Sequence, residues 1–301
     1  MTMPDLSNFA QLTVSGIALG CLYALVALGF VIVLKSSSVL NMVQGSFVLL
    51  GAYLTYQVHV TWGAPFAVAV GAAVVGVALL GVVTEVTIVR RIPHRAEFST
   101  VMVTLGLLVV VQTLVAAVWG YDPLNMGDPW GLSTVDLGGT TLSTLHLTVI
   151  GASVIVLLLF AALFRWTRVG LAMRAASADR EAAIAQGISP GLVLGISWLL
   201  AGSVGALAGV ALGSAAQGGL RITIDLVALA ALPAVIFGGL DSLAGAVIGS
   251  LVIGLAQLYA AGYAPDWAGA GFPSVMPYVV MIVVLLVRPR GLFGSQEVRR
   301  A

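Results

Sequence analysis

The side chains that most often perform chemistry are scarce in this chain and lie far apart. There is one lysine, Lys35, and one cysteine, Cys21, which has no partner within the chain for a disulfide. A phosphate-binding loop needs its lysine after a glycine-rich turn, and the segment VIVLKSSS around Lys35 has no such turn. The three histidines, His59, His94 and His146, lack the spacing of metal ligands. The sequence therefore predicts no ATP hydrolysis by this chain, no metal site and no cofactor.

One segment, 165–190, concentrates charge, and from residue 170 onward it reads GLAMRAASADREAAIAQGISP. Asp179 is a suitable N-cap for a short helix that begins at Arg180, and Gly187 suits the position just after that helix. Two short helical elements joined at Asp179 are therefore expected. Their small alanine face could dock into a groove on another protein. The alternative is a loop whose arginines only fix topology and contact anionic lipid headgroups.

The composition places these elements in a membrane. The chain has 301 residues, of which 60% are hydrophobic and 8% charged, and its mean hydropathy is +1.09. Soluble domains carry about 25% charged residues. A formal net charge of +1 gives no basic field for nucleic acid, so a DNA or RNA partner is not expected. The 36 glycines often recur four residues apart, as in Gly16 and Gly20 or Gly205 and Gly209, which favours close helix packing.

The fold class expected is an all-α transmembrane bundle of eight or nine spans, forming one transmembrane domain over 1–301. A span needs roughly 20 mainly apolar residues. In 224–262, Pro233 and Asp241 interrupt the apolar run. This part is therefore expected to form either two spans or one span plus a re-entrant or broken segment. The stretches that satisfy this length are 11–34, 39–58, 64–88, 99–119, 145–164, 191–213, 224–240, 242–262 and 273–288.

The arginines predict the orientation, because loops rich in arginine and lysine stay in the cytoplasm. Loop 120–144 and the N-terminus contain aspartate without lysine or arginine, which suits the outer face. We expect the N-terminus outside, the C-terminus in the cytoplasm and segment 165–190 in the cytoplasm. The arginines that follow the third, fifth and last spans are Arg90, Arg91, Arg95, Arg165, Arg168, Arg174, Arg180, Arg288, Arg290, Arg299 and Arg300.

Polar residues within the spans are candidates for a translocation path, because such groups tend to face the interior of a bundle. Four are singled out: Tyr23, Asn41, Gln44 and Asp241. Segments 40–51 and 240–251 resemble each other, which would place Asn41, Gln44 and Asp241 at corresponding points of two halves. For each residue, a hydrogen bond between helices is the alternative role.

The charged segment also carries a family resemblance. Glu181-Ala182-Ala183-x-x-x-Gly187 resembles the EAA loop of ATP-binding-cassette importer permeases, without the Ile-x-Leu-Pro ending of the longer motif. Segment 16–53 is similar to the opening of the permease subunits of branched-chain amino-acid importers, in which Gly-x-x-Tyr-Ala-Leu-x-Ala-Leu-Gly precedes Asn-x-x-x-Gly. The matching residues are Gly20, Tyr23, Ala24, Leu25, Ala27, Leu28, Gly29, Asn41 and Gly45. The segments AVIFGGLDSLAGAVIGSLVIGLAQ and VLLVRPRGLFG continue the resemblance in order.

This resemblance implies a non-catalytic permease subunit in the cytoplasmic membrane of a bacterium. Its partners would be two ATP-binding subunits, a second related permease subunit and an extracytoplasmic solute-binding protein. The cargo would be a small polar solute such as a branched-chain or other amino acid. Gln44 and Ser46 replace a histidine and an acidic residue usual in the family, which keeps urea, a short amide or a small carboxylate open. The ATPase contact would use Arg174, Asp179, Arg180, Glu181, Ala182 and Gly187.

A stand-alone secondary transporter or channel is the competing class. Ion-coupled carriers place ionisable residues within the membrane. Few are available here: Glu85 lies near the cytoplasmic end of the third stretch, and Asp225 and Asp241 flank a short one. Asp225 is also placed to pair with Arg221, four residues earlier.

Overall fold

The structure is a computed structural model that describes residues 6–37, 39–92, 97–127, 134–137, 140–215, 219–240, 242–265, 268–269 and 271–294. The chain forms two compact units that interleave along the sequence. Unit 1 comprises Met1–Val31, Trp130–Ser153 and Leu229–Ala301, and unit 2 comprises Ile32–Pro129 and Val154–Ala228. Each unit is described by itself.

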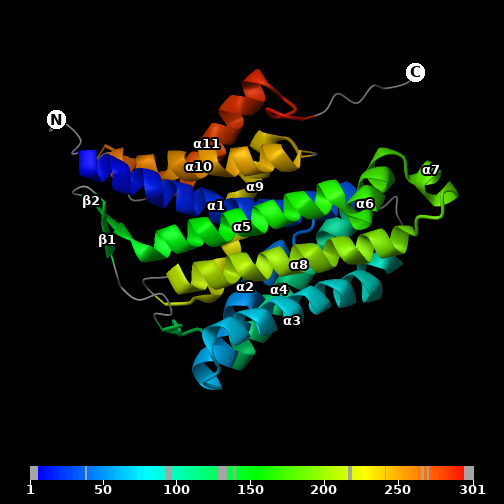
Figure 1. Cartoon of the computed structure of the whole chain (residues 1–301), viewed down its shortest axis with the longest axis horizontal. Helices are drawn as coiled ribbons and strands as arrows, with labels where there is room; N and C mark the ends of the chain where they lie inside the picture. The colour runs from blue at the N-terminus through cyan, green and yellow to red at the C-terminus, as the bar shows by residue number, and fades with distance from the viewer. Residues whose placement is uncertain are drawn as a thin grey trace. The chain divides into compact units, whose positions relative to one another are not determined.

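Helices make up almost all of the described chain (Figure 1). Short non-α turns are η1 (Gln57–Thr61, a π-helix), η2 (Val89–Arg91) and η3 (Ile222–Leu226), both 3₁₀. The α-helices are α1 (Leu6–Ser37), α2 (Gln44–Tyr56), α3 (Phe66–Thr87), α4 (Glu97–Trp119), α5 (Thr144–Trp166), α6 (Arg168–Ala178), α7 (Arg180–Ala185), α8 (Pro190–Ala215), α9 (Val227–Gly238), α10 (Leu243–Tyr263) and α11 (Phe272–Val287).

Each of the nine predicted stretches contains a helix, which confirms a multi-pass helical protein. Among the described residues, six helices are long and apolar enough to cross a membrane: α1, α3, α4, α5, α8 and α10. α2 and α9, with 13 and 12 residues, are shorter than the predicted stretches 39–58 and 224–240, whereas α11 has 16 residues, as many as the predicted stretch 273–288. Gly239, with φ of +101°, follows the end of α9, and Ser242 caps α10, so the described part of 224–262 contains two separate helices.

A small hairpin adds strands that the sequence analysis did not predict. β1 (Thr134–Leu137) pairs antiparallel with β2 (Thr140–Ser143), with Thr134 opposite Ser143. Threonine and valine favour extended backbone, and this short polar stretch is too brief for a helix.

Unit 2 is built around the packing of α3 and α2 on α8. One face of α3 buries Ala69, Ala73, Val77 and Gly81 at four-residue spacing. A Cβ atom placed on Gly81 would lie 2.6 Å from the Trp198 carbonyl oxygen, so only glycine permits this approach. The stripe Val75, Leu79 and Val83 is exposed, as expected of a helix that faces lipid.

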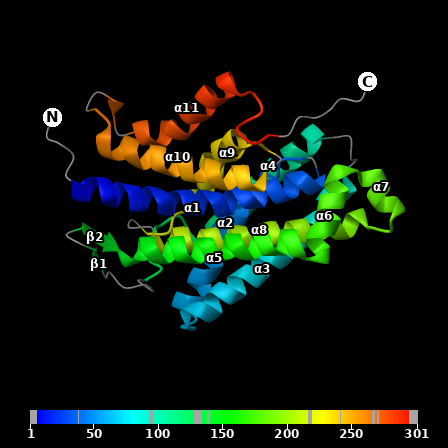
Figure 2. The ribbon, with the colours of Figure 1, turned by 45° about the horizontal axis from the view of Figure 1, so that its top comes forward.

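Unit 1 brings α10 against the N-terminal part of α1 and against α11 (Figure 2). Cβ atoms placed on Gly16 and Gly20 would lie 3.0 Å and 2.8 Å from the Cα atoms of Leu255 and Leu251. The predicted use of four-residue glycine spacing in helix packing is therefore confirmed in both units.

Candidate functional site

Segment 165–190 forms two short helices, as predicted. Thr167 caps α6 by accepting a 3.1 Å hydrogen bond from the Gly170 N–H. Asp179 caps α7, because its Oδ1 accepts a 2.9 Å hydrogen bond from the Ala182 N–H. Figures 1 and 2 both show α6 and α7 at one end of α8, within unit 2. We call the residues Arg168–Gly187 the α6–α7 segment.

Gly187 ends α7 with a left-handed backbone. Its φ is +84°, and nothing lies within 4 Å of the position where a Cβ would stand. The Gly187 N–H donates to the Ile184 carbonyl at 2.9 Å, and the Ile188 N–H donates to the Ala183 carbonyl at 3.0 Å. Glycine is thus required here for its backbone conformation and not for space, and α8 begins three residues later at Pro190.

The predicted contact residues of the α6–α7 segment face solvent. Ala183 is buried and anchors α7, whereas the Ile184 side chain is 50% exposed. Arg180 begins α7. The exposed residues of the predicted set are Arg174, Asp179, Glu181, Ala182 and Gly187. These residues make a surface with a small apolar centre and charged edges.

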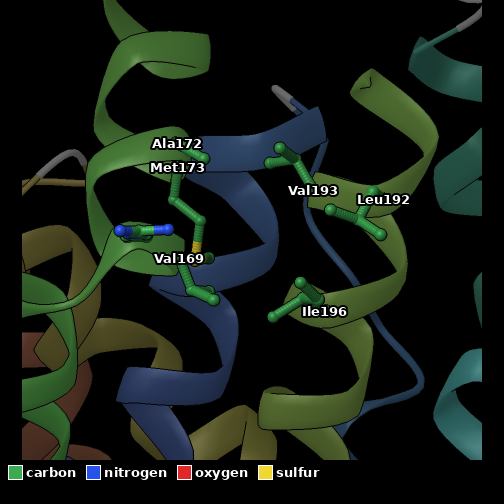
Figure 3. Close-up of a pocket in the computed structure, with 7 residues that line it drawn as sticks. Val169, Ala172, Met173, Leu192, Val193 and Ile196 are labelled. Atoms are coloured by element: carbon green, nitrogen blue, oxygen red, sulfur yellow. The ribbon is translucent and has the colours of Figure 1, made fainter. Parts of the chain in front are cut away.

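α6 and α8 together line an open pocket of about 170 Å³. Figure 3 shows Val169, Ala172 and Met173 of α6 on one side, and Leu192, Val193 and Ile196 of α8 on the other. The pocket is lined almost entirely by apolar side chains of α6 and α8, and Leu192 at its rim is 63% exposed.

A buried ion pair connects α3 to the start of α8. Glu85 has no exposed surface, and Arg90 of η2 binds it with both ends of its guanidinium, Nε to Oε1 at 2.9 Å and Nη2 to Oε2 at 2.7 Å. The same Nη2 donates to the Gly191 carbonyl oxygen at 3.0 Å. The sequence suggested Glu85 only as an ion-relay candidate. Its pairing with Arg90 was not predicted, although an arginine five residues later was the signal for it.

A second group of polar side chains is buried around the start of α2. Asn41 is 1% exposed, and its Oδ1 accepts a 3.0 Å hydrogen bond from the Val43 N–H. Gln44 is fully buried and donates through Nε2 to the Ala201 carbonyl of α8 at 3.2 Å. The other polar atom of each carboxamide, Asn41 Nδ2 and Gln44 Oε1, has no hydrogen-bond partner among the described residues.

Ser46 and Asp225 belong to the same group, and sequence analysis did not assign them to it. Each is at least 97% buried, and Ser46 Oγ and Asp225 Oδ1 also lack a hydrogen-bond partner in the part of the chain that the structure describes. Asp225 lies against Gly45, since a Cβ on Gly45 would stand 2.8 Å from the Asp225 carbonyl oxygen and 3.4 Å from its Cβ. The expected ion pair with Arg221 is wrong: Arg221 is exposed, and the structure forms no such pair among the described residues.

The four predicted path residues do not all come together. Asn41 and Gln44 lie three residues apart at the same helix start in unit 2. Tyr23 belongs to unit 1, where its hydroxyl donates to Gln257 Oε1 of α10 at 2.7 Å. This bond is the helix–helix role that the sequence left open for Tyr23. Asp241 lies outside the described residues.

The described residues hold no cluster of three or more histidine, cysteine, aspartate or glutamate side chains that could bind a metal ion. The candidate site consists of the exposed surface of the α6–α7 segment and the buried polar group around the start of α2, both in unit 2.

Comparison with known proteins decides the family. The family described as "Branched-chain amino acid transport system / permease component" matches residues 12–287. The chain belongs to this permease family. Over 306 residues it is 25% identical to the high-affinity branched-chain amino acid transport system permease protein LivH of Escherichia coli (strain K12), covering 97% of each chain. It is 23% identical to the corresponding protein BraD of Pseudomonas aeruginosa, covering 99% of this chain and 100% of BraD.

A solved structure has a similar fold. PsaBC from Streptococcus pneumoniae in complex with Fab contains a chain that superposes with a TM-score of 0.52 at 16% identity, covering 93% of this chain and 92% of the other. At this identity the likeness concerns the fold alone. The family match spans every helix from α1 to α11, so the α6–α7 segment and the buried polar group both lie within the permease region.

Proposed function

We propose that this chain is the permease subunit of an ATP-binding-cassette importer and forms the translocation path for a branched-chain amino acid. The observation that carries the proposal is the exposed, doubly capped α6–α7 segment within a chain that belongs to the permease family. The names of the relatives LivH and BraD support the cargo.

The proposed topology puts the N-terminus outside and the C-terminus in the cytoplasm. The α6–α7 segment then lies on the cytoplasmic side with Arg168 and Arg174, where an ATPase subunit can reach it. Loop 120–127 contains Asp122 and no arginine or lysine, which suits the outer face. Units 1 and 2 together form the single permease domain, 1–301.

In the proposed mechanism, the α6–α7 segment seats in a groove of the ATPase with Ala182 and Ile184 at the centre and Arg174, Asp179 and Glu181 at the edge. Arg180, at the start of α7, belongs to the same contact. ATP binding and hydrolysis would move α7 and, through the short connection 188–189, the start of α8.

The Arg90–Glu85 pair would extend this movement to α3, because Arg90 also holds the Gly191 carbonyl at the start of α8. Chemistry stays in the ATPase, and the permease only changes conformation.

The proposed assembly contains this chain, a second related permease subunit, two ATP-binding subunits and an extracytoplasmic solute-binding protein. Cargo would pass from the binding protein into the permease pair. The buried polar residues Asn41 and Gln44 would contact the cargo. Tyr23 and Asp241 stay candidates for the path, although the Tyr23 hydroxyl is already bonded to Gln257.

The test is co-purification of the tagged importer with its ATPase, comparing Gly187→Leu with Gly120→Leu. Both glycines have a φ near +80° and open space around the Cβ position, so both substitutions carry the same backbone strain. We expect Gly187→Leu to lose the ATPase and ATP-driven uptake, and Gly120→Leu, in a loop on the proposed outer side, to retain both.

Normal ATPase recovery with Gly187→Leu would contradict the docking role. Recovery of the wild-type chain alone, with solute uptake that needs no ATP, would instead favour a stand-alone transporter or channel.

A further inference from the structure

Two short helices begin at the same place in unit 2. α2 has 13 residues and starts at Gln44, and α9 has 12 residues and starts at Val227, two residues after Asp225. A Cβ on Gly45 would stand 3.3 Å from the Ala228 Cβ as well as against Asp225, so the first turns of the two helices are in contact. α2 continues through η1 to Thr61, and η3 and α9 run together over Ile222–Gly238, so both stretches lie at the short end of the lengths that span a membrane. We call this place the α2–α9 junction.

The α2–α9 junction presents hydrogen-bond donors from the first turn of α2. The first N–H groups of a helix lack intrahelical partners and carry partial positive charge. In α2 the Gln44 N–H donates to the Asn41 carbonyl at 3.3 Å, which leaves the N–H groups of Gly45 and Ser46. Val43, at the N-cap, provides no side-chain hydrogen bond to them. Asn41 is held at this point by its bond to the Val43 N–H, which leaves its Nδ2 as a further buried donor. This arrangement suits a carboxylate.

The junction also contains acceptors. Asp225 is 97% buried, and its Oδ1 has no hydrogen-bond partner among the described residues, nor does Gln44 Oε1. A buried carboxylate normally has a cationic partner, and Arg221, the nearest in sequence, faces solvent instead. A buried carboxylate oxygen without a partner suits an ammonium group.

We propose that the α2–α9 junction binds the zwitterionic head of an α-amino acid. The substrate carboxylate would contact the first turn of α2, Asn41 Nδ2 and the Ser46 hydroxyl, and its ammonium group would contact the Asp225 carboxylate. Interrupted helices that bind charged substrate groups at their ends occur in other transporters. The inference rests on the proposed function, because it requires cargo to cross this chain.

The proposal selects among the cargo classes that the sequence left open. Urea, short amides and simple carboxylates all lack an ammonium group, so none of them would bring a cation to Asp225, although urea and amides carry neutral N–H donors. An amino acid satisfies both halves of the junction with no net charge added to the membrane interior. In the structure Gly45 lies against Asp225, and cargo would enter by displacing this contact within unit 2.

The test is equilibrium binding of radiolabelled leucine to the purified importer complex without its solute-binding protein. Competitors are 4-methylpentanoate, which is leucine without the ammonium group, and leucinamide, which lacks the carboxylate. We expect wild type to prefer leucine over each competitor at least tenfold. Asp225→Asn should weaken leucine binding at least tenfold and remove the preference over 4-methylpentanoate, while Asp225→Glu should retain that preference.

Asp122→Asn is the matched control, because Asp122 is exposed in loop 120–127, and it should change neither value. Wild type that binds 4-methylpentanoate as tightly as leucine would overturn the inference without any variant. Asp225→Asn that assembles with the ATPase and keeps the preference would also overturn it. Failure of the proposed function is separate, since wild-type vesicles supplied with ATP and the solute-binding protein would then take up no amino acid.

Discussion

At the residue scale, polar side chains that look equivalent in the sequence differ in whether they keep an unpaired hydrogen-bonding atom that could bind a ligand. Tyr23 and Asn41 are both polar and buried, but the Tyr23 hydroxyl is bonded to Gln257, whereas Asn41 Nδ2 lacks a partner among the described residues. Buried polar atoms usually find partners, and leaving one unpaired costs about 1–3 kcal/mol. Packing between helices alone would not require that cost, so Asn41 is the better path candidate.

We predict that Asn41→Ala slows uptake about tenfold, the loss expected when a hydrogen bond of 1–2 kcal/mol to the cargo is removed. ATPase co-purification should be unchanged. Asn125→Ala is the control, since Asn125 likewise accepts a bond from an N–H two residues ahead, Gly127, but is exposed. Uptake kinetics in vesicles measure the effect, and wild-type rates for Asn41→Ala would remove this residue from the path.

At the element scale, the Arg90–Glu85 pair joins α3 to α8. The two partners are not equivalent, because the Glu85 side chain is fully buried and the Arg90 side chain is 44% exposed. Without Arg90, an unpaired carboxylate remains buried, whereas without Glu85 the guanidinium can turn to water.

We therefore predict that Arg90→Gln lowers the free energy of unfolding by about 3 kcal/mol, and Glu85→Gln by clearly less. The double variant should be more stable than Arg90→Gln, because it carries no unpaired buried charge. Denaturant unfolding of the detergent-purified chain provides the comparison. Equal losses for the two single variants would show that the buried carboxylate is not the dominant cost.

At the scale of the whole molecule, the proposed topology depends on the arginine distribution. The native Cys21 is buried, and in a Cys21→Ser background single cysteines can report on each side. Tyr121 is 80% exposed in loop 120–127, and Ser177 is exposed in the α6–α7 segment.

We predict that a membrane-impermeant thiol reagent labels Tyr121→Cys in intact cells and labels Ser177→Cys only after the membrane is opened. The reverse pattern would invert the topology and separate the α6–α7 segment from any cytoplasmic ATPase. Cys21→Ser without an added cysteine controls for background labelling.

Local rules in the sequence were enough to predict several elements. Apolar length located a helix in all nine stretches, because each must satisfy its own backbone hydrogen bonds in lipid. Asp179 and Gly187 marked the two ends of α7, because capping and a positive φ depend on a few neighbouring residues. The helix lengths of α2 and α9 were overestimated, since hydropathy does not register where a turn interrupts an apolar run.

The sequence by itself determined a helical membrane protein with a capped, charged segment, because hydropathy and capping act over one or two helical turns. Only the tertiary structure decided which polar groups are satisfied. Tyr23 is hydrogen-bonded to Gln257, 234 residues away in the sequence, and Arg90 links Glu85 of α3 to Gly191 of α8. Asp225 lies against Gly45 and has no cationic partner among the described residues. Such pairings depend on how distant helices pack, and that packing is set by small residues facing one another across helices.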